Sequence, residues 1–176
     1  MSKLPYEPNS VPFMVVGTII LWVSWLFFNG GSTMNIAAPR DSGTPKIMMN
    51  TIISGAIGGL VSVSFKPLIF GTYSNNMKYD IGALCNGILG GLVSITGACD
   101  AVQPSGAFAI GFIGGLVYCS SAYMCVKFRV DDPIEASAVH GFCGMWGLIA
   151  VGFFHKEKGV LFGTADNSTQ LNFLMI

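Results

Sequence analysis

The sequence predicts an all-α integral membrane protein with five transmembrane helices, and three observations support this class. Of the 176 residues, 52% are hydrophobic, and the mean hydropathy is +0.61. Only 10% of the residues are charged, whereas soluble domains carry about 25%. The 23 glycines are concentrated inside the apolar runs and follow no collagen period. This composition is typical of a protein that crosses a lipid bilayer several times.

The charge balance and the motif content exclude several classes of function. Nine basic and nine acidic residues cancel, so we expect no nucleic-acid partner. The five cysteines form no C-x-x-C pair, and the sequence contains no G-x-S-x-G motif, no phosphate-binding P-loop and no H-E-x-x-H motif. We therefore expect neither an enzyme nor a bound metal or cofactor.

Five apolar runs are long enough to cross the bilayer as helices. A helix needs about 20 apolar residues to span the hydrocarbon core, and runs of this kind lie at 11–33, 47–70, 81–99, 105–126 and 133–154. None of them alternates apolar and polar residues as a barrel strand does. We expect residues 1–10 to form a polar N-terminal segment without a cleaved leader, and residues 155–176 to form a polar tail that leads into a truncated further helix.

The first span ends in a polar and aromatic face. Trp25, Phe28 and Ser32 are spaced i, i+3 and i+7 and therefore share one side of a helix. Aromatic faces attract cations, and a serine oxygen can accept a hydrogen bond from an N–H group. A small cation stripped of its water could be held there. On the residues alone, packing or lipid-facing aromatics are the better supported interpretation.

The second, third and fourth spans share a repeated sequence pattern. It reads GAIGGLVSV at 55–63, GILGGLVSI at 87–95 and GFIGGLVYC at 111–119. Each copy contains a G-x-x-x-G motif, which lets the backbone of a neighbouring helix approach closely in lipid. The paired glycines that we expect at helix contacts are Gly55 and Gly59, Gly87 and Gly91, and Gly111 and Gly115.

The fifth span has a predicted N-terminal cap. Asp132, Pro133 and Glu135 form D-P-x-E, with Asp132 at the N-cap, proline at the first helical position and Glu135 reaching back from the third. Acidic side chains also suit the positive end of the helix dipole. A structural cap accounts for these residues better than a catalytic role.

His140 is the strongest candidate for a functional residue. It lies eight positions after Asp132, which is about 12 Å along a helix and close to the middle of the membrane. Ionisable groups at this depth are costly and mark functional sites. The alternative, a neutral histidine bonded to a neighbouring helix, is equally supported by position. Its helical neighbours are all small: Ala136, Ser137, Cys143, Gly144 and Gly147.

Four segments of the chain resemble the ammonium transporter/Rhesus family. The sixth transmembrane helix of the family, which ends G-W-F-x-F-N-x-G-S, resembles PNSVPFMVVGTIILWVSWLFFNGGST at 8–33. The N-T pair of the seventh helix resembles Asn50-Thr51, and the eighth helix resembles GALCNGILGGLVSITGAC at 82–99. The tenth-helix signature, D-D-P…H-G-x-x-G-x-W-G, resembles VDDPIEASAVHGFCGMWG at 130–147. The similarity runs from about Pro8 to Gly163.

This resemblance implies conduction of ammonium or ammonia. In the family, two inverted five-helix repeats enclose a narrow pore, and three protomers associate. Carried over by motif, Ser32 would be the hydroxyl of the outer ammonium site and Phe28 one ring of the gate. Trp25 would line the pore, and His140 would be one of two facing histidines. The family resemblance implies the plasma membrane, with an organelle membrane such as the mitochondrial inner membrane as the alternative.

The chain also departs from the family, because it resembles only the second repeat. Helices equivalent to the first repeat, with the first pore histidine and the second gate phenylalanine, have no counterpart in the sequence. One hypothesis is therefore half of an ammonium channel, completed by a first-half partner chain or by sequence that lies outside this chain. The other is a structural membrane subunit derived from such a half, which contributes helix packing to a larger complex without transport.

Overall fold

The computed structural model describes residues 10–34, 43–70 and 80–161, and within these ranges the chain is helical with no strand. The helices are α1 (Val11–Gly31), α2 (Thr44–Phe70), α3 (Ile81–Thr96), α4 (Pro104–Lys127), the π-helical turn η1 (Ser137–Phe142) and α5 (Cys143–Phe154). In these ranges, four helices are long and apolar enough to cross a membrane, with η1 and α5 counted as one; α3 is apolar but has 16 residues. Nearly all of the predicted N-terminal segment and the end of the predicted tail lie outside the described residues.

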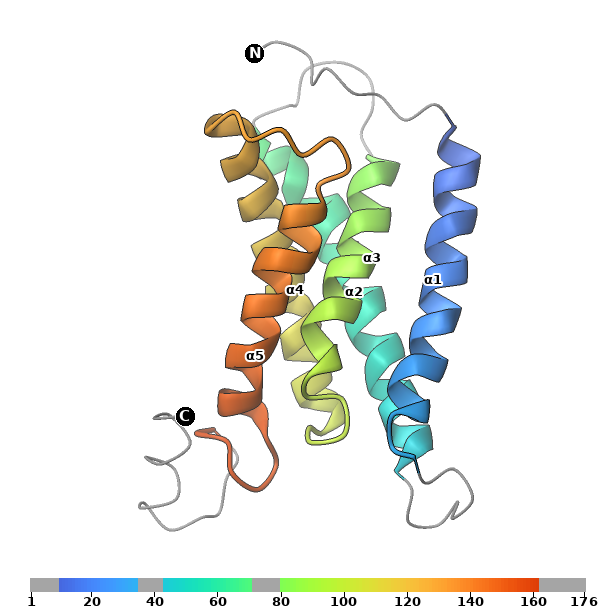
Figure 1. Ribbon diagram of the computed structural model, residues 1–176. Helices are drawn as coiled ribbons and strands as arrows, with labels where there is room; N and C mark the ends of the chain where they lie inside the picture. The colour runs from blue at the N-terminus through green and yellow to red at the C-terminus, as the bar shows by residue number, and fades with distance from the viewer. Residues whose placement is uncertain (1–9, 35–42, 71–79, 162–176) are drawn as a thin grey trace.

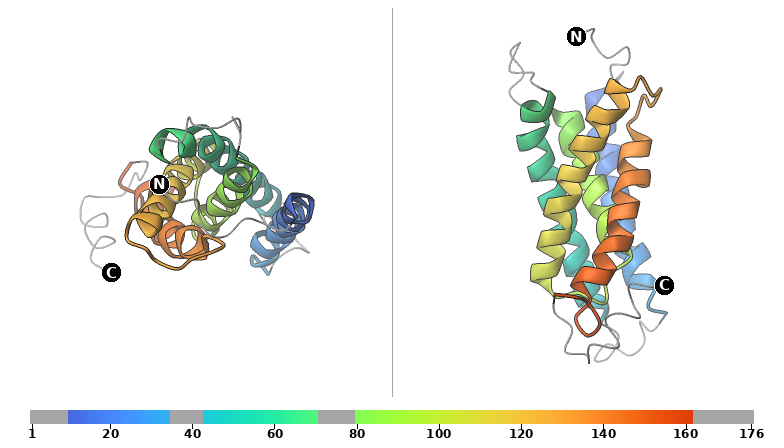
Figure 2. Two further views of the ribbon diagram at one scale, coloured as in Figure 1. Left: turned by 90° about the horizontal axis from the view of Figure 1, so that it is seen from above. Right: turned by 90° about the vertical axis from the view of Figure 1, so that its left-hand side faces the viewer.

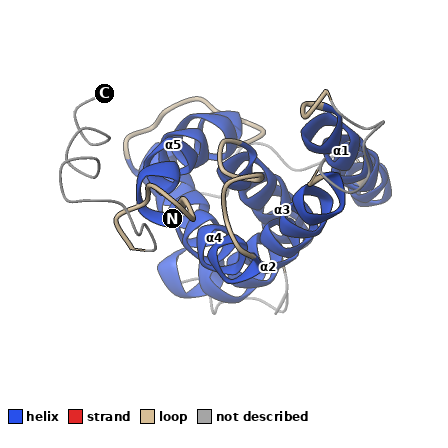
Figure 3. Cartoon of the chain, turned by 90° about the horizontal axis from the view of Figure 1, so that it is seen from below, coloured by secondary structure: helices blue, strands red, loops and turns tan. Residues whose placement is uncertain are grey.

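The helices stand side by side along a common direction (Figure 1). Viewed along that direction, α2, α3 and α4 form the centre of the bundle, with α1 at one edge (Figure 2). Helix α2 packs against both α3 and α4, α1 contacts α2 and α3, and α5 contacts α3 and α4. Helices α1 and α5 both pack on α3, which presents one face between them (Figure 3).

Glycines bring α2, α3 and α4 into backbone contact. A Cβ atom on Gly58 would lie 2.6 Å from the carbonyl oxygen of Gly87, and one on Gly115 would lie 2.8 Å from that of Gly58. A side chain at Gly91 or Gly111 would overlap the backbone of Ser54. Any larger residue would push the helices apart. The other motif glycines meet side chains of the facing helix: Gly55 meets Leu92, Gly59 meets Ile88 and Gly87 meets Ser62.

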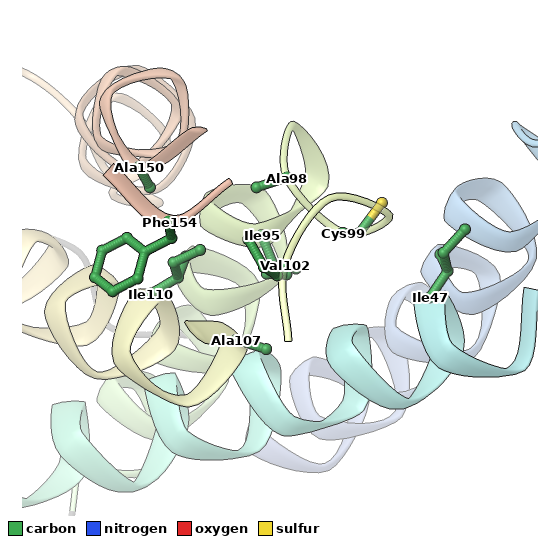
Figure 4. Packing of buried hydrophobic residues seen from close by; sticks show 9 residues of the cluster. All are labelled: Ile47, Ile95, Ala98, Cys99, Val102, Ala107, Ile110, Ala150 and Phe154. Atoms are coloured by element: carbon green, nitrogen blue, oxygen red, sulfur yellow. The ribbon is translucent and has the colours of Figure 1, made fainter. Parts of the chain in front are cut away.

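A cluster of buried apolar residues closes the bundle near the turn that joins α3 to α4. In Figure 4, Ile95, Val102, Ile110 and Phe154 gather between α3, α4 and α5, while Ile47 lies apart on α2. The turn itself is held by a side chain, because the Asn50 amide donates to the carbonyl oxygens of Cys99 at 2.9 Å and Val102 at 3.1 Å. These two bonds fix the chain just after α3, which ends at Thr96 rather than at the expected residue 99.

The start of the fifth span differs from the predicted cap. Pro133 and Glu135 precede the helix, and Glu135 has a left-handed backbone with φ 57°. The Asp132 carboxylate still accepts hydrogen bonds at the helix start, from the amides of Ala136 at 2.8 Å and Ser137 at 2.7 Å. Glu135 does not reach back to Asp132, because its carboxylate binds Lys66 of α2 instead. A buried cation is a stronger partner than a terminal amide.

Candidate functional site

His140 occupies the η1 turn, and its side chain is exposed on the surface of the described chain. A π-helical turn holds one extra residue, and such turns occur frequently at functional sites. The residues around the ring leave space. A Cβ atom on Gly141 would meet no atom within 4 Å, and one on Gly144 would meet only Val93 at 3.8 Å. The imidazole is therefore not enclosed by its own bundle.

The histidine opens into a hollow of about 350 Å³ on the α3 face between α1 and α5. The hollow is lined by Trp25 of α1, by Val93, Thr96 and Gly97 from α3 and its end, and by His140, Gly144, Gly147 and Leu148. The lining is mostly apolar, and among the described residues the imidazole is the titratable side chain that it contains. Glycines leave the backbone uncovered, so a small molecule without its water could approach the ring closely. The structure thus brings two of the predicted site residues, Trp25 and His140, to one surface.

Trp25 is fixed in place by a residue that the sequence reasoning missed. Its Nε1–H donates to the hydroxyl of Thr96 at 2.8 Å, and that hydroxyl donates to the carbonyl oxygen of Leu92 at 2.7 Å. The indole ring also meets Phe28 edge-on, with ring centroids 6.5 Å apart. Thr96 is the threonine of the segment that resembles the eighth family helix, and this motif was the only signal for it.

Phe28 and Ser32 lie outside this hollow, at the end of α1. Phe28 is 62% exposed, and the Ser32 hydroxyl donates to the Phe28 carbonyl oxygen at 2.6 Å. Their neighbour Asn29 is buried and donates through Nδ2 to the Thr51 hydroxyl at 3.1 Å, which ties α1 to α2. The aromatic ring and the hydroxyl are therefore presented from the bundle surface and are not enclosed within the chain.

A second polar cluster lies at the opposite end of the bundle from the α3–α4 turn. The Lys66 ammonium donates to both carboxylate oxygens of Glu135, at 2.9 and 3.1 Å, and to the hydroxyl of Tyr118 at 3.0 Å. It also lies 3.5 Å from Asp80. Asn86 donates to Glu135 at 2.9 Å, and the Tyr118 hydroxyl donates to the same carboxylate. The cluster gives each charge a partner, as burial requires.

The chain is similar to known ammonium transporters in sequence. The model of the Ammonium Transporter Family matches residues 1–175. The chain is 36% identical over 171 residues to ammonium transporter 1 member 3 of Solanum lycopersicum, which covers 93% of this chain and 36% of that protein. It is 38% identical over 163 residues to ammonium transporter Amt2 of Archaeoglobus fulgidus, with coverage of 90% and 33%.

Solved structures of the same kind resemble the bundle. Mep2 of Saccharomyces cerevisiae superposes with a TM-score of 0.76 at 28% identity, covering 98% of this chain and 42% of that chain. A Sensor Amt Protein superposes with a TM-score of 0.75 at 30% identity, covering 97% and 42%. The chain spans about a third of the length of the curated relatives that it matches. On the extent of these matches, this chain belongs to the ammonium transporter family.

Proposed function

We propose that this chain forms one wall of a pore that conducts ammonium or ammonia, and that a first-half ammonium transporter chain supplies the other wall. The observation that carries the proposal is the hollow beside His140, which, among the described residues, is bordered by α1, by α3 and its end, and by η1 and α5. An imidazole in the middle of a membrane is costly unless it faces a polar path or a partner. A second set of helices over this face would provide both.

The residues around the hollow suit a small, polar and uncharged molecule. A ring nitrogen of neutral His140 can donate or accept one hydrogen bond, which replaces part of the water that ammonia loses. The apolar lining opposes an ion that carries its hydration shell. At the end of α1, the Phe28 ring would act in the gate and the Ser32 hydroxyl in ammonium recruitment, with Trp25 lining the path between them and His140.

The proposal extends to the assembly and the membrane. The protein is an integral membrane protein with several spans. We propose that the complete protomers, each with its own pore, associate as a trimer as in the family. The trimer would lie in the plasma membrane, or in an organelle membrane such as the mitochondrial inner membrane. The lipid bilayer covers the exposed apolar side chains of α1, such as Phe13, Ile20 and Phe27.

The test is to purify the tagged chain from its native membranes, identify the chains that co-purify, and measure [¹⁴C]methylammonium flux after reconstitution of the complex into liposomes. We expect a first-half ammonium transporter chain in the complex and flux above that of empty liposomes. A complex of unrelated membrane subunits without flux would contradict the proposal and favour a structural subunit.

A further inference from the structure

We propose that Glu135 is a positioning residue for His140. Its carboxylate, held by Lys66, Asn86 and Tyr118, fixes the point at which the η1 turn begins and thereby keeps the imidazole directed into the hollow. The inference rests on the proposed role of His140 in conduction, and it assigns a function to a polar cluster whose described residues do not line the hollow.

The side chain of Glu135 joins three helices to one point of the loop. Lys66 comes from α2, Asn86 from α3 and Tyr118 from α4, and all three donate to the same carboxylate. The pair is largely buried, with 10% of the Lys66 side chain and 18% of the Glu135 side chain exposed. A charged hydrogen bond in such surroundings is directional and well fixed. The loop is therefore anchored to α2, α3 and α4, the three helices that the glycines bring into backbone contact.

The backbone of Glu135 is held in an energetically unfavourable conformation. A left-handed conformation at φ 57° is unfavourable for a residue with a side chain, and it persists where the surrounding contacts determine it. The carbonyl oxygen of the same residue accepts from the amide of Val139 at 3.0 Å. Asp132 accepts from the amides of Ala136 and Ser137. The chain before His140 is thus held by the Asp132 carboxylate at Ala136 and Ser137, and by Glu135 through both its side chain and its carbonyl oxygen.

The register of the η1 turn decides where His140 points. Each residue added to or removed from a helix rotates the side chains beyond it by about 100°. Helix α5, which follows η1, is fixed against α3. Gly147 and Ala150 of α5 are buried, and a Cβ on Gly147 would lie 2.8 Å from the Ser94 carbonyl oxygen. If the loop were released, η1 could relax to an α-helix with one residue fewer in the turn. Because α5 is fixed, the resulting rotation of about 100° would move the residues that precede α5. His140 would then turn away from the hollow.

The test measures the stability of the η1 turn and the accessibility of His140 in the purified native complex. We would compare Glu135→Ala, the conservative variant Glu135→Gln and, as a matched control, Glu157→Gln, a substitution of a glutamate with a 69% exposed side chain beyond α5. Two readouts apply: hydrogen exchange of the amides at 136–142 against those at 55–62, and the rate at which diethylpyrocarbonate modifies His140. Methylammonium flux is measured on the same samples.

For Glu135→Ala we expect exchange at 136–142 to rise about tenfold or more, with exchange at 55–62 unchanged. The modification rate of His140 should change and the flux should fall, with a smaller change in all three readouts for Glu135→Gln and none for Glu157→Gln. Unchanged exchange at 136–142 in both Glu135 variants would overturn the proposal, as would an equal rise at 55–62. Exchange and modification do not depend on conduction, so absent flux in the unsubstituted complex would contradict only the proposed function.

Discussion

Replacing His140 with alanine is expected to lower methylammonium flux through the reconstituted complex by about 5- to 150-fold. The imidazole is the titratable group in the hollow, and in its absence a molecule that has shed water finds no hydrogen-bond partner there. Leaving a desolvated polar group unpaired costs about 1–3 kcal/mol, which corresponds to this range of rates. The change removes side-chain volume at a position that the chain itself leaves exposed and adds no group that would clash with covering helices, so the complex should still assemble.

His155→Ala is the matched control for this prediction. His155 follows α5, outside the hollow, and its Nδ1 accepts from the amides of Glu157 and Lys158. We expect flux within about twofold of the unsubstituted complex for this variant, because the half-buried His155 does not line the hollow and its loss affects local stability only modestly. Equal flux from the His140 and His155 variants, with assembly intact in both, would remove His140 from the conduction path.

The second large effect is on stability. Lys66→Met should lower the free energy of unfolding in detergent by about 3–5 kcal/mol, because it leaves the largely buried carboxylate of Glu135 without its cation. Methionine fills most of the space of the aliphatic stem, so lost packing contributes little. Steric trapping or denaturant titration of the purified protein gives the measurement.

The pairing itself is tested by a double-mutant cycle. Adding Glu135→Gln to Lys66→Met removes the unpaired charge, so the double variant should be more stable than Lys66→Met alone. Lys156→Met is the control, because its pair with Glu157 is 3.8 Å long and exposed on both sides, and such pairs contribute about 0–1 kcal/mol. Additive losses from the two single substitutions would show that Lys66 and Glu135 do not act as a pair.

The helical part of the fold is predictable because it depends on local patterns. Apolar runs of sufficient length predict the helices, and the structure ends them within a few residues of the expected positions. The glycine motifs predict close helix contacts, but not which helices meet. In the structure, a Cβ on Gly115 of α4 would lie 2.8 Å from the carbonyl oxygen of Gly58 of α2. No spacing along the chain specifies this pairing of α2 with α4.

The part that could not be predicted depends on residues that are distant in sequence. Locally, D-P-x-E has the pattern of a helix cap, and no neighbouring residue indicates that the Glu135 side chain binds elsewhere and does not cap the helix. Lys66, 69 residues earlier, decides the outcome. Thr96 was missed for the same reason, since its partner Trp25 lies 71 residues away. Buried polar pairs of this kind satisfy their charges or donors through tertiary contacts.

The central claim is that another set of helices covers the hollow beside His140. The most direct measurement places a photoreactive amino acid at Leu148, which lines the hollow and is 74% exposed, and identifies the product after illumination of native membranes. The account predicts a covalent adduct with a transmembrane helix of a first-half ammonium transporter chain. An adduct with lipid alone would contradict it.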